Sequence, residues 1–75
     1  MEKNFKKIIL MYRAPLGFKT GYLIKEIVYA FLPSNLLLKK TKELLIEHGC
    51  CLAEIYHSNG DGTYSFEKII YLKSK

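Results

Sequence analysis

The apolar residues of this chain recur at spacings that fit helices in some segments and strands in others. Residues 4–13, "NFKKIILMYR", place apolar side chains at i, i+3, i+4 and i+7 from Phe5, which is the stripe of an amphipathic helix. The same segment holds five consecutive apolar residues, from Ile8 to Tyr12, and such a run also fits a buried strand. We favour a helix here and keep a strand as the alternative.

A second helix is predicted over residues 20–32, "TGYLIKEIVYAFL". Thr20 is a candidate N-cap, and Pro33 disfavours helical geometry at the residue before it. The apolar stripe of this helix consists of Leu23, Ile27, Ala30 and Phe31.

Residues 36–49, "LLLKKTKELLIEHG", form the third predicted helix. Ser34 or Asn35 can cap its N-terminus, and Gly49 is suited to the position just after its end. The side of this helix that is expected to face the core is an arc about 120° wide, counting a rotation of about 100° per residue. That arc contains Leu37, Leu38, Thr41, Leu44, Leu45 and His48.

From Cys50 onward the pattern predicts two strands joined by a turn. Residues 50–58 and 63–73 are rich in aromatic and β-branched side chains, and they flank the glycine-rich "NGDG" of residues 59–62. The alternation of apolar and polar residues that begins at Tyr64 breaks near Lys68. We therefore expect a bulge in the second strand or burial of both of its faces.

The 75 residues are expected to form one small α+β domain with two or three helices followed by a C-terminal β-hairpin. If residues 4–13 are a strand, the order becomes βααββ, with a three-stranded antiparallel sheet. No apolar run approaches the ~20 residues of a membrane span. We therefore expect a cytoplasmic protein that does not enter a membrane.

The turn region, residues 57–68 or "HSNGDGTYSFEK", resembles the calcium loop of an EF-hand. Gly62, Asn59 and Asp61 match the turn glycine and two ligand positions. His57 and Lys68 stand at the first and last positions, where the family has an Asp and a bidentate Glu. An ammonium repels Ca²⁺, so we interpret the segment as a hairpin turn that binds no metal.

The other reactive side chains form no known catalytic or metal-binding pattern. His48, Cys50, Cys51 and His57 do not have the spacing of a zinc site, and the adjacent cysteines are expected to be reduced thiols, at least one of them packed in the core. No phosphate-binding glycine loop and no paired catalytic carboxylates are found. The sequence predicts a protein that is not an enzyme and uses no cofactor.

The uneven distribution of charge along the chain indicates an anionic partner. The net charge of +5 arises from residues 1–42, which carry nine basic and two acidic side chains, whereas residues 43–75 carry three basic and five acidic ones.

The predicted order of elements resembles a winged helix-turn-helix domain, in which residues 36–49 would be the recognition helix and Asn59–Gly62 the wing. This resemblance implies a small nucleic-acid-binding protein, such as a transcriptional regulator. The residues expected to contact nucleic acid are Lys39, Lys40, Lys42, Lys19, Lys25 and Asn35.

The alternative function is protein–protein interaction. The chain would then be a small module, such as a mobile-element-encoded inhibitor or adaptor, that occupies a partner's surface or forms a homodimer. Leu36 and Ile46 fall off the apolar arc of residues 36–49, and Tyr29 lies on the polar side of the second predicted helix. These three residues are the candidate protein contacts.

Overall fold

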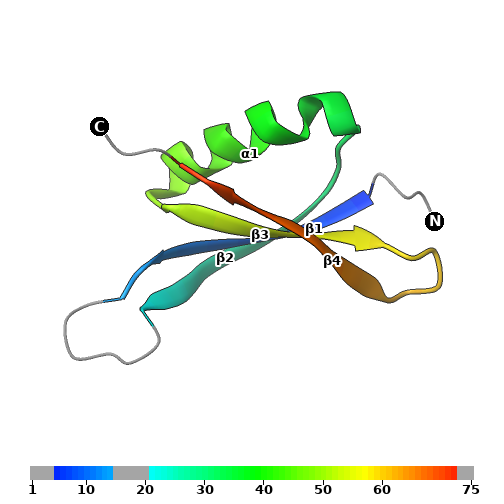
Figure 1. Cartoon of the computed structure of the whole chain (residues 1–75), viewed down its shortest axis with the longest axis horizontal. Coiled ribbons are helices and arrows are strands. Elements are labelled where there is room, and N and C mark those ends of the chain that lie inside the picture. Colours follow the sequence, from blue (N-terminus) through cyan, green and yellow to red (C-terminus); the bar gives the residue numbers. More distant parts are fainter. Residues whose placement is uncertain (1–4, 15–20, 73–75) are drawn as a thin grey trace.

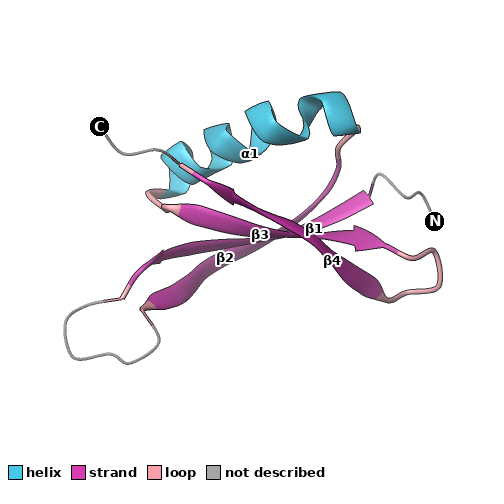
Figure 2. Cartoon of the chain, viewed as in Figure 1, coloured by secondary structure: helices cyan, strands magenta, loops and turns pink. Residues whose placement is uncertain are grey.

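Four antiparallel β-strands and one helix make up the part of the chain that the computed structural model describes, residues 5–14 and 21–72 (Figures 1 and 2). Strands β1 and β2 precede the helix α1, and β3 and β4 follow it. Their order across the sheet is β2-β1-β3-β4. The bounds are Phe5–Arg13 for β1, Tyr22–Phe31 for β2, Ser34–His48 for α1, Leu52–Ser58 for β3 and Tyr64–Tyr71 for β4.

The hydrophobic core lies between α1 and one face of the sheet. Ile8 and Leu10 of β1 and Ile55 of β3 are fully buried there, as is Leu45 of the helix. The core cluster consists of Ile8, Leu10, Leu32, Leu37, Leu45, Cys50, Ala53, Ile55 and Ile70. A core this small is typical of a domain of this length, because short chains bury a smaller fraction of their surface.

The prediction of a helix over residues 20–32 is wrong, because this segment is the ten-residue strand β2. A β-bulge explains the error. Leu10 of β1 pairs with Glu26 and Met11 pairs with Ile24, so Lys25 is an extra residue in β2. An extra residue interrupts the two-residue alternation of a strand and creates spacings of three and four that resemble a helix.

The fold class predicted from the sequence is therefore wrong in both of its versions. Residues 5–13 form a strand rather than the favoured helix. The βααββ alternative has one helix too many and one strand too few, since residues 22–31 pair along β1. A single helix between two hairpins also does not fit a winged helix-turn-helix domain.

Helix α1 was predicted correctly in place but not in its N-terminal cap. Pro33 occupies the N-cap position with extended geometry and no capping side chain, so neither Ser34 nor Asn35 acts as the cap. Gly49 ends the helix at φ 69°, the left-handed conformation that glycine adopts most readily. Leu38, expected on the core side, is instead 55% exposed.

The C-terminal hairpin is present as the sequence indicates. β3 and β4 pair from Leu52 with Tyr71 to Ser58 with Tyr64. The expected bulge in the second strand is confirmed, because Tyr56 pairs with Phe66 and Ile55 with Lys68, which leaves Glu67 as the extra residue.

The hydroxyl of Thr41 is fully buried and has no hydrogen-bond partner among the described residues. An unsatisfied buried hydroxyl costs free energy, whereas a methyl group of the same shape does not. We expect Thr41→Val to raise the free energy of unfolding by about 1 kcal/mol, measured by urea denaturation. Thr41→Ser keeps the hydroxyl and loses the methyl, and it should destabilise the protein. A Val variant less stable than the wild type would contradict this prediction.

Candidate functional site: the open face of the sheet

The face of the sheet that points away from α1 carries a second set of apolar side chains. Side chains alternate along a strand, so the neighbours of the buried Ile8 and Leu10 point to this open face, as do the residues paired with them. In β1 and β3 the open face consists of Phe5, Lys7, Ile9, Met11, Arg13, Leu52, Glu54, Tyr56 and Ser58; in β2 and β4 it consists of Tyr22, Ile24, Ile27, Tyr29, Phe31, Tyr64, Phe66, Ile69 and Tyr71.

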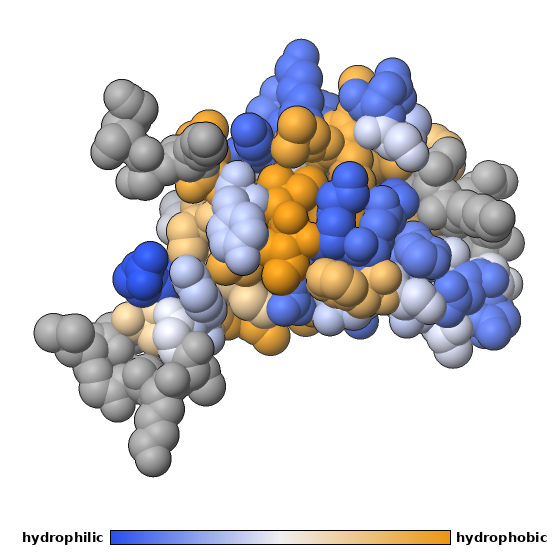
Figure 3. Space-filling view, viewed as in Figure 1, coloured by the Kyte–Doolittle hydropathy of each residue, from blue (hydrophilic) through white to orange (hydrophobic). Residues whose placement is uncertain are grey.

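Among the described residues, most of the exposed large apolar side chains lie on this face. Those on the open face are exposed by 38–59% and belong without exception to the edge strands β2 and β4. They are Ile24, Ile27, Tyr29, Phe31, Phe66, Ile69 and Tyr71. Figure 3, which views the molecule from one side, shows apolar side chains reaching the surface over the strands near the centre of the molecule. A sheet face that contacts only water usually carries polar residues, so this face has the character of an interface.

Lys7 lies inside a group of aromatic rings at one end of the open face. Its ammonium nitrogen is 5.1 Å from the centre of the Tyr56 ring and 5.4 Å from that of Tyr64. Tyr29 contacts Tyr64 edge-on at 5.9 Å, and Phe66 contacts Tyr56 edge-on at 5.6 Å. Cation–π contacts of this kind stabilise the ammonium by about 0.5–2 kcal/mol, so one cation is accommodated within an apolar surface.

Glu54 is the acidic residue of this face. Its carboxylate Oε1 accepts a hydrogen bond of 3.1 Å from the Tyr56 hydroxyl. Desolvation and this hydrogen bond to Glu54 raise the pKa of Tyr56 above its ordinary value. The described residues give Glu54 no ion pair with a lysine or arginine.

The structure places the predicted protein contacts on two different surfaces. Tyr29 lies on the open face, whereas Leu36 and Ile46 are exposed by 40% and 67% on α1, on the other side of the sheet. Sequence reasoning missed the remaining open-face residues of β2 because it assigned that segment to a helix. The signal was its content of aromatic and β-branched residues, which favours a strand.

The predicted nucleic-acid contacts lie on two elements of the described chain. At about 100° per residue, Lys39, Lys40 and Lys42 project from α1 within an arc of about 160°, with Lys39 between the other two. Lys40 also pairs with Glu43 at 3.7 Å. Lys25 is on β2, Asn35 is exposed in the first turn of α1, and Lys19 lies outside the described residues. The three lysines thus share one broad side of α1, where Glu43 pairs with Lys40, and Lys25 lies apart from them on β2.

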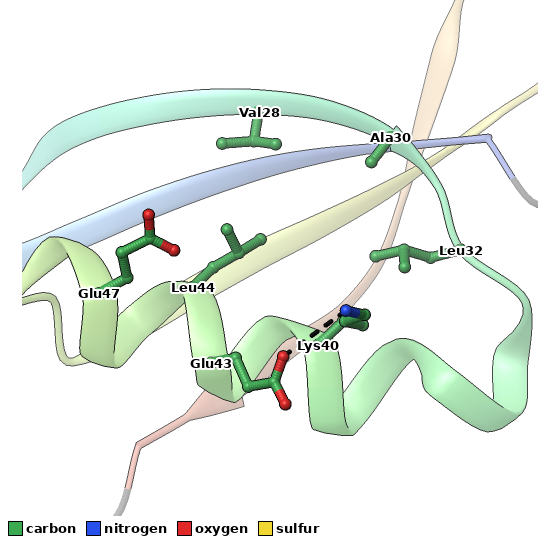
Figure 4. Close-up of a pocket in the computed structure, with 7 residues that line it drawn as sticks. All are labelled: Val28, Ala30, Leu32, Lys40, Glu43, Leu44 and Glu47. Atoms are coloured by element: carbon green, nitrogen blue, oxygen red, sulfur yellow. Dashed lines mark ion pairs between the residues drawn. The ribbon is translucent and has the colours of Figure 1, made fainter.

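A shallow groove runs between β2 and α1 on the helix side of the sheet (Figure 4). Its volume is about 280 Å³, and it is lined by Val28, Ala30, Leu32, Lys40, Glu43, Leu44 and Glu47. Small-molecule sites are usually larger, at about 300–1,000 Å³, and they bury most of the ligand's surface. The groove shows instead that α1 leaves the edge strand β2 partly uncovered.

The segment that resembles a calcium loop is a hairpin turn held by its own side chains. The Asp61 carboxylate accepts hydrogen bonds from the hydroxyl and the backbone N–H of Thr63, at 2.6 and 3.1 Å. These bonds lower the pKa of Asp61. Gly60 and Gly62 adopt φ values of 90° and 94°, which the turn requires. Among the described residues, no group of three or more His, Cys, Asp and Glu side chains is placed to hold a metal ion.

The two cysteines are free thiols with different surroundings. Cys50 is buried beside α1, and burial raises the pKa of its thiol; Cys51 is partly exposed. Because the thiolate is the reactive form, we expect iodoacetamide at pH 8 to alkylate Cys51 well before Cys50. Peptide mass spectrometry over time measures the two rates. Equal rates in the folded protein would contradict the placement of Cys50 in the core.

The comparisons with known proteins add no family to this description. No protein-family model, curated protein or solved structure matches the chain at a significant level. In the described residues, no helix is both long enough and apolar enough to span a membrane.

Proposed function

We propose that this protein is a protein-interaction module that binds its partner through the open face of the sheet. The observation that carries the proposal is the cluster of half-exposed apolar side chains on β2 and β4, with no element of the described chain covering them. Burying these side chains would stabilise the protein by roughly 25 cal/mol for each Å² of apolar surface removed from water. A partner that covers the face recovers this free energy.

The composition of the open face supports a protein partner over a nucleic acid. Interface cores are enriched in Tyr, Phe and Met and depleted in Lys, Glu and Asp. The open face has this composition, with Lys7, Arg13 and Glu54 as its charged residues. The aromatic rings around Lys7 could stack on bases, but Ile9, Ile24, Ile27 and Ile69 cannot. Nucleic-acid binding through Lys39, Lys40 and Lys42 stays a prediction.

The test is affinity capture by the tagged protein from nuclease-treated extract of the native host, compared between two variants. We expect Ile27→Asp to abolish capture of protein partners, because a carboxylate among the apolar side chains of the face cannot be desolvated without a counter-charge. Lys39→Ala/Lys40→Ala/Lys42→Ala is the matched control on α1 and should capture as the wild type does. Capture that survives Ile27→Asp but is lost with the helix variant or with nuclease would refute the proposal in favour of nucleic-acid binding.

A further inference from the structure

We propose that the partner covering the open face is a second copy of this chain, packed sheet against sheet about a two-fold axis parallel to the strands. This inference rests on the proposed function, because it names the occupant of the same surface. It is argued from the register of the strands, from the charges of the face and from its area.

The strand register makes the open face complementary to itself. A two-fold axis that runs between the central strands β1 and β3 lays β1 of one copy over the partner's β3, and β2 over the partner's β4. Rows of paired residues cross the sheet, such as Ile27–Ile9–Glu54–Ile69. In this arrangement Ile27 meets the partner's Ile69, Ile24 meets the partner's Tyr71, and Tyr29 meets the partner's Phe66. Two such twisted sheets pack with their strands about 30° apart.

The central charges distinguish this axis from the other one possible. With the axis along the strands, the partner's Glu54 faces Ile9, and Lys7 lies two residues along the same strand as the next side chain of the open face, so this approach of opposite charges occurs twice. An axis across the strands through the Ile9–Glu54 row stacks each strand on its own copy, so Lys7 is separated from the partner's Glu54 both by two residues along the strand and by one strand across the sheet. In that case the two Glu54 side chains approach each other on stacked β3 strands. Opposite charges at the centre of an interface fix the register of packing.

The area of the face is sufficient for a stable dimer. A specific interface buries about 800 Å² on each partner. The seven half-exposed side chains of β2 and β4 alone offer roughly 600 Å², since a large side chain has about 150–250 Å² in total. The central strands add Ile9, Met11 and the ring of Tyr56. An interface of about 800 Å² on each partner is a modest share of the protein's accessible surface of 5276 Å².

The decisive experiment uses two variants with opposite charge changes, analysed by sedimentation velocity and native mass spectrometry. Lys7→Glu gives the two central strands of the face two acidic residues, and Glu54→Lys gives them two basic residues. Each variant alone should be monomeric at a concentration where the wild type is dimeric. An equimolar mixture should regain the dimer as a heterodimer, because each acidic face then meets a basic one. Ile27→Asp should be monomeric alone and in either mixture.

Circular dichroism and thermal unfolding of each variant establish that it is folded, and Ile27→Asp keeps the test independent of the Lys7 cluster. Salt gives a second readout: two copies of net charge +5 repel, so the wild-type dimer should tighten severalfold from 50 to 500 mM NaCl. A wild type that is monomeric at 100 µM overturns the inference. So does a dimer that survives Ile27→Asp or a mixture of charge variants that stays monomeric. If the wild type is monomeric but still captures another host protein through Ile27, the proposed function stands and only the identity of the partner is refuted.

Discussion

Leu45→Ala is expected to lower the free energy of unfolding by about 3 kcal/mol, the usual cost of truncating a fully buried leucine. Leu45 is 0% exposed and belongs to the core cluster between α1 and the sheet. A domain of this length has a total stability of roughly 4–11 kcal/mol. The substitution therefore removes a large share of this stability, and the variant should unfold with a midpoint at a much lower urea concentration than the wild type.

The control for Leu45→Ala is Leu38→Ala on the same helix. The chemical change and the helix propensity are the same, but Leu38 is 55% exposed, so the expected loss is below about 1 kcal/mol. Similar losses for the two variants would mean that α1 does not pack on the sheet through the side that holds Leu45.

The second large effect concerns the ion pair between Lys6 and Glu67. The Lys6 ammonium is 2.7 Å from Glu67 Oε1, and the lysine side chain is 5% exposed against 24% for the glutamate. His57 Nδ1 lies 3.8 Å from the same oxygen. The bulge in β4 inserts Glu67 as the extra residue and so allows it to contact β1 across β3.

Removing the two members of this pair should have unequal effects. Glu67→Gln leaves a buried ammonium without a counter-charge, and we expect a loss of about 2 kcal/mol, below the full cost for a completely buried pair. Lys6→Met removes the buried charge, and the partly exposed Glu67 can be hydrated, so its cost should stay below about 1 kcal/mol. Thermal and urea unfolding of both single variants and the double variant measure the difference. Equal losses for the single variants, or a double variant worse than Glu67→Gln, would contradict this account.

Local signals predicted α1 and the C-terminal hairpin well. Helix α1 has a long, strongly periodic pattern and a glycine at its end, and the hairpin has a glycine-rich turn between two segments of high β-propensity. In both, the residues that decide the conformation lie close together in the sequence. The bulge near Lys68 was also predicted, because it reverses the alternation of apolar residues within a few positions.

The first hairpin could not be predicted in the same way. In β2 the bulge at Lys25 disguises the alternation, and Leu23, Ile27 and Ala30 then imitate a helical stripe. β1 has apolar residues on both of its faces, because Ile8 and Leu10 pack in the core beneath α1 while Ile9 and Met11 belong to the open face. That pattern carries no periodicity from which to tell a strand from a buried helix.

The sequence by itself determined the helix, the second hairpin and the scarcity of catalytic or metal-binding patterns, since each depends on residues within one short segment. Only the tertiary structure decided where the open face, our proposed interaction surface, lies. Pairing β2 along β1 brings Ile24, Ile27 and Tyr29 onto the same face as Phe66 and Ile69, about 40 residues away in the chain. The same pairing places Lys25 on β2, apart from Lys39, Lys40 and Lys42 on α1. Which side chains share a surface depends on strand register and bulges, and both are set by contacts between distant segments.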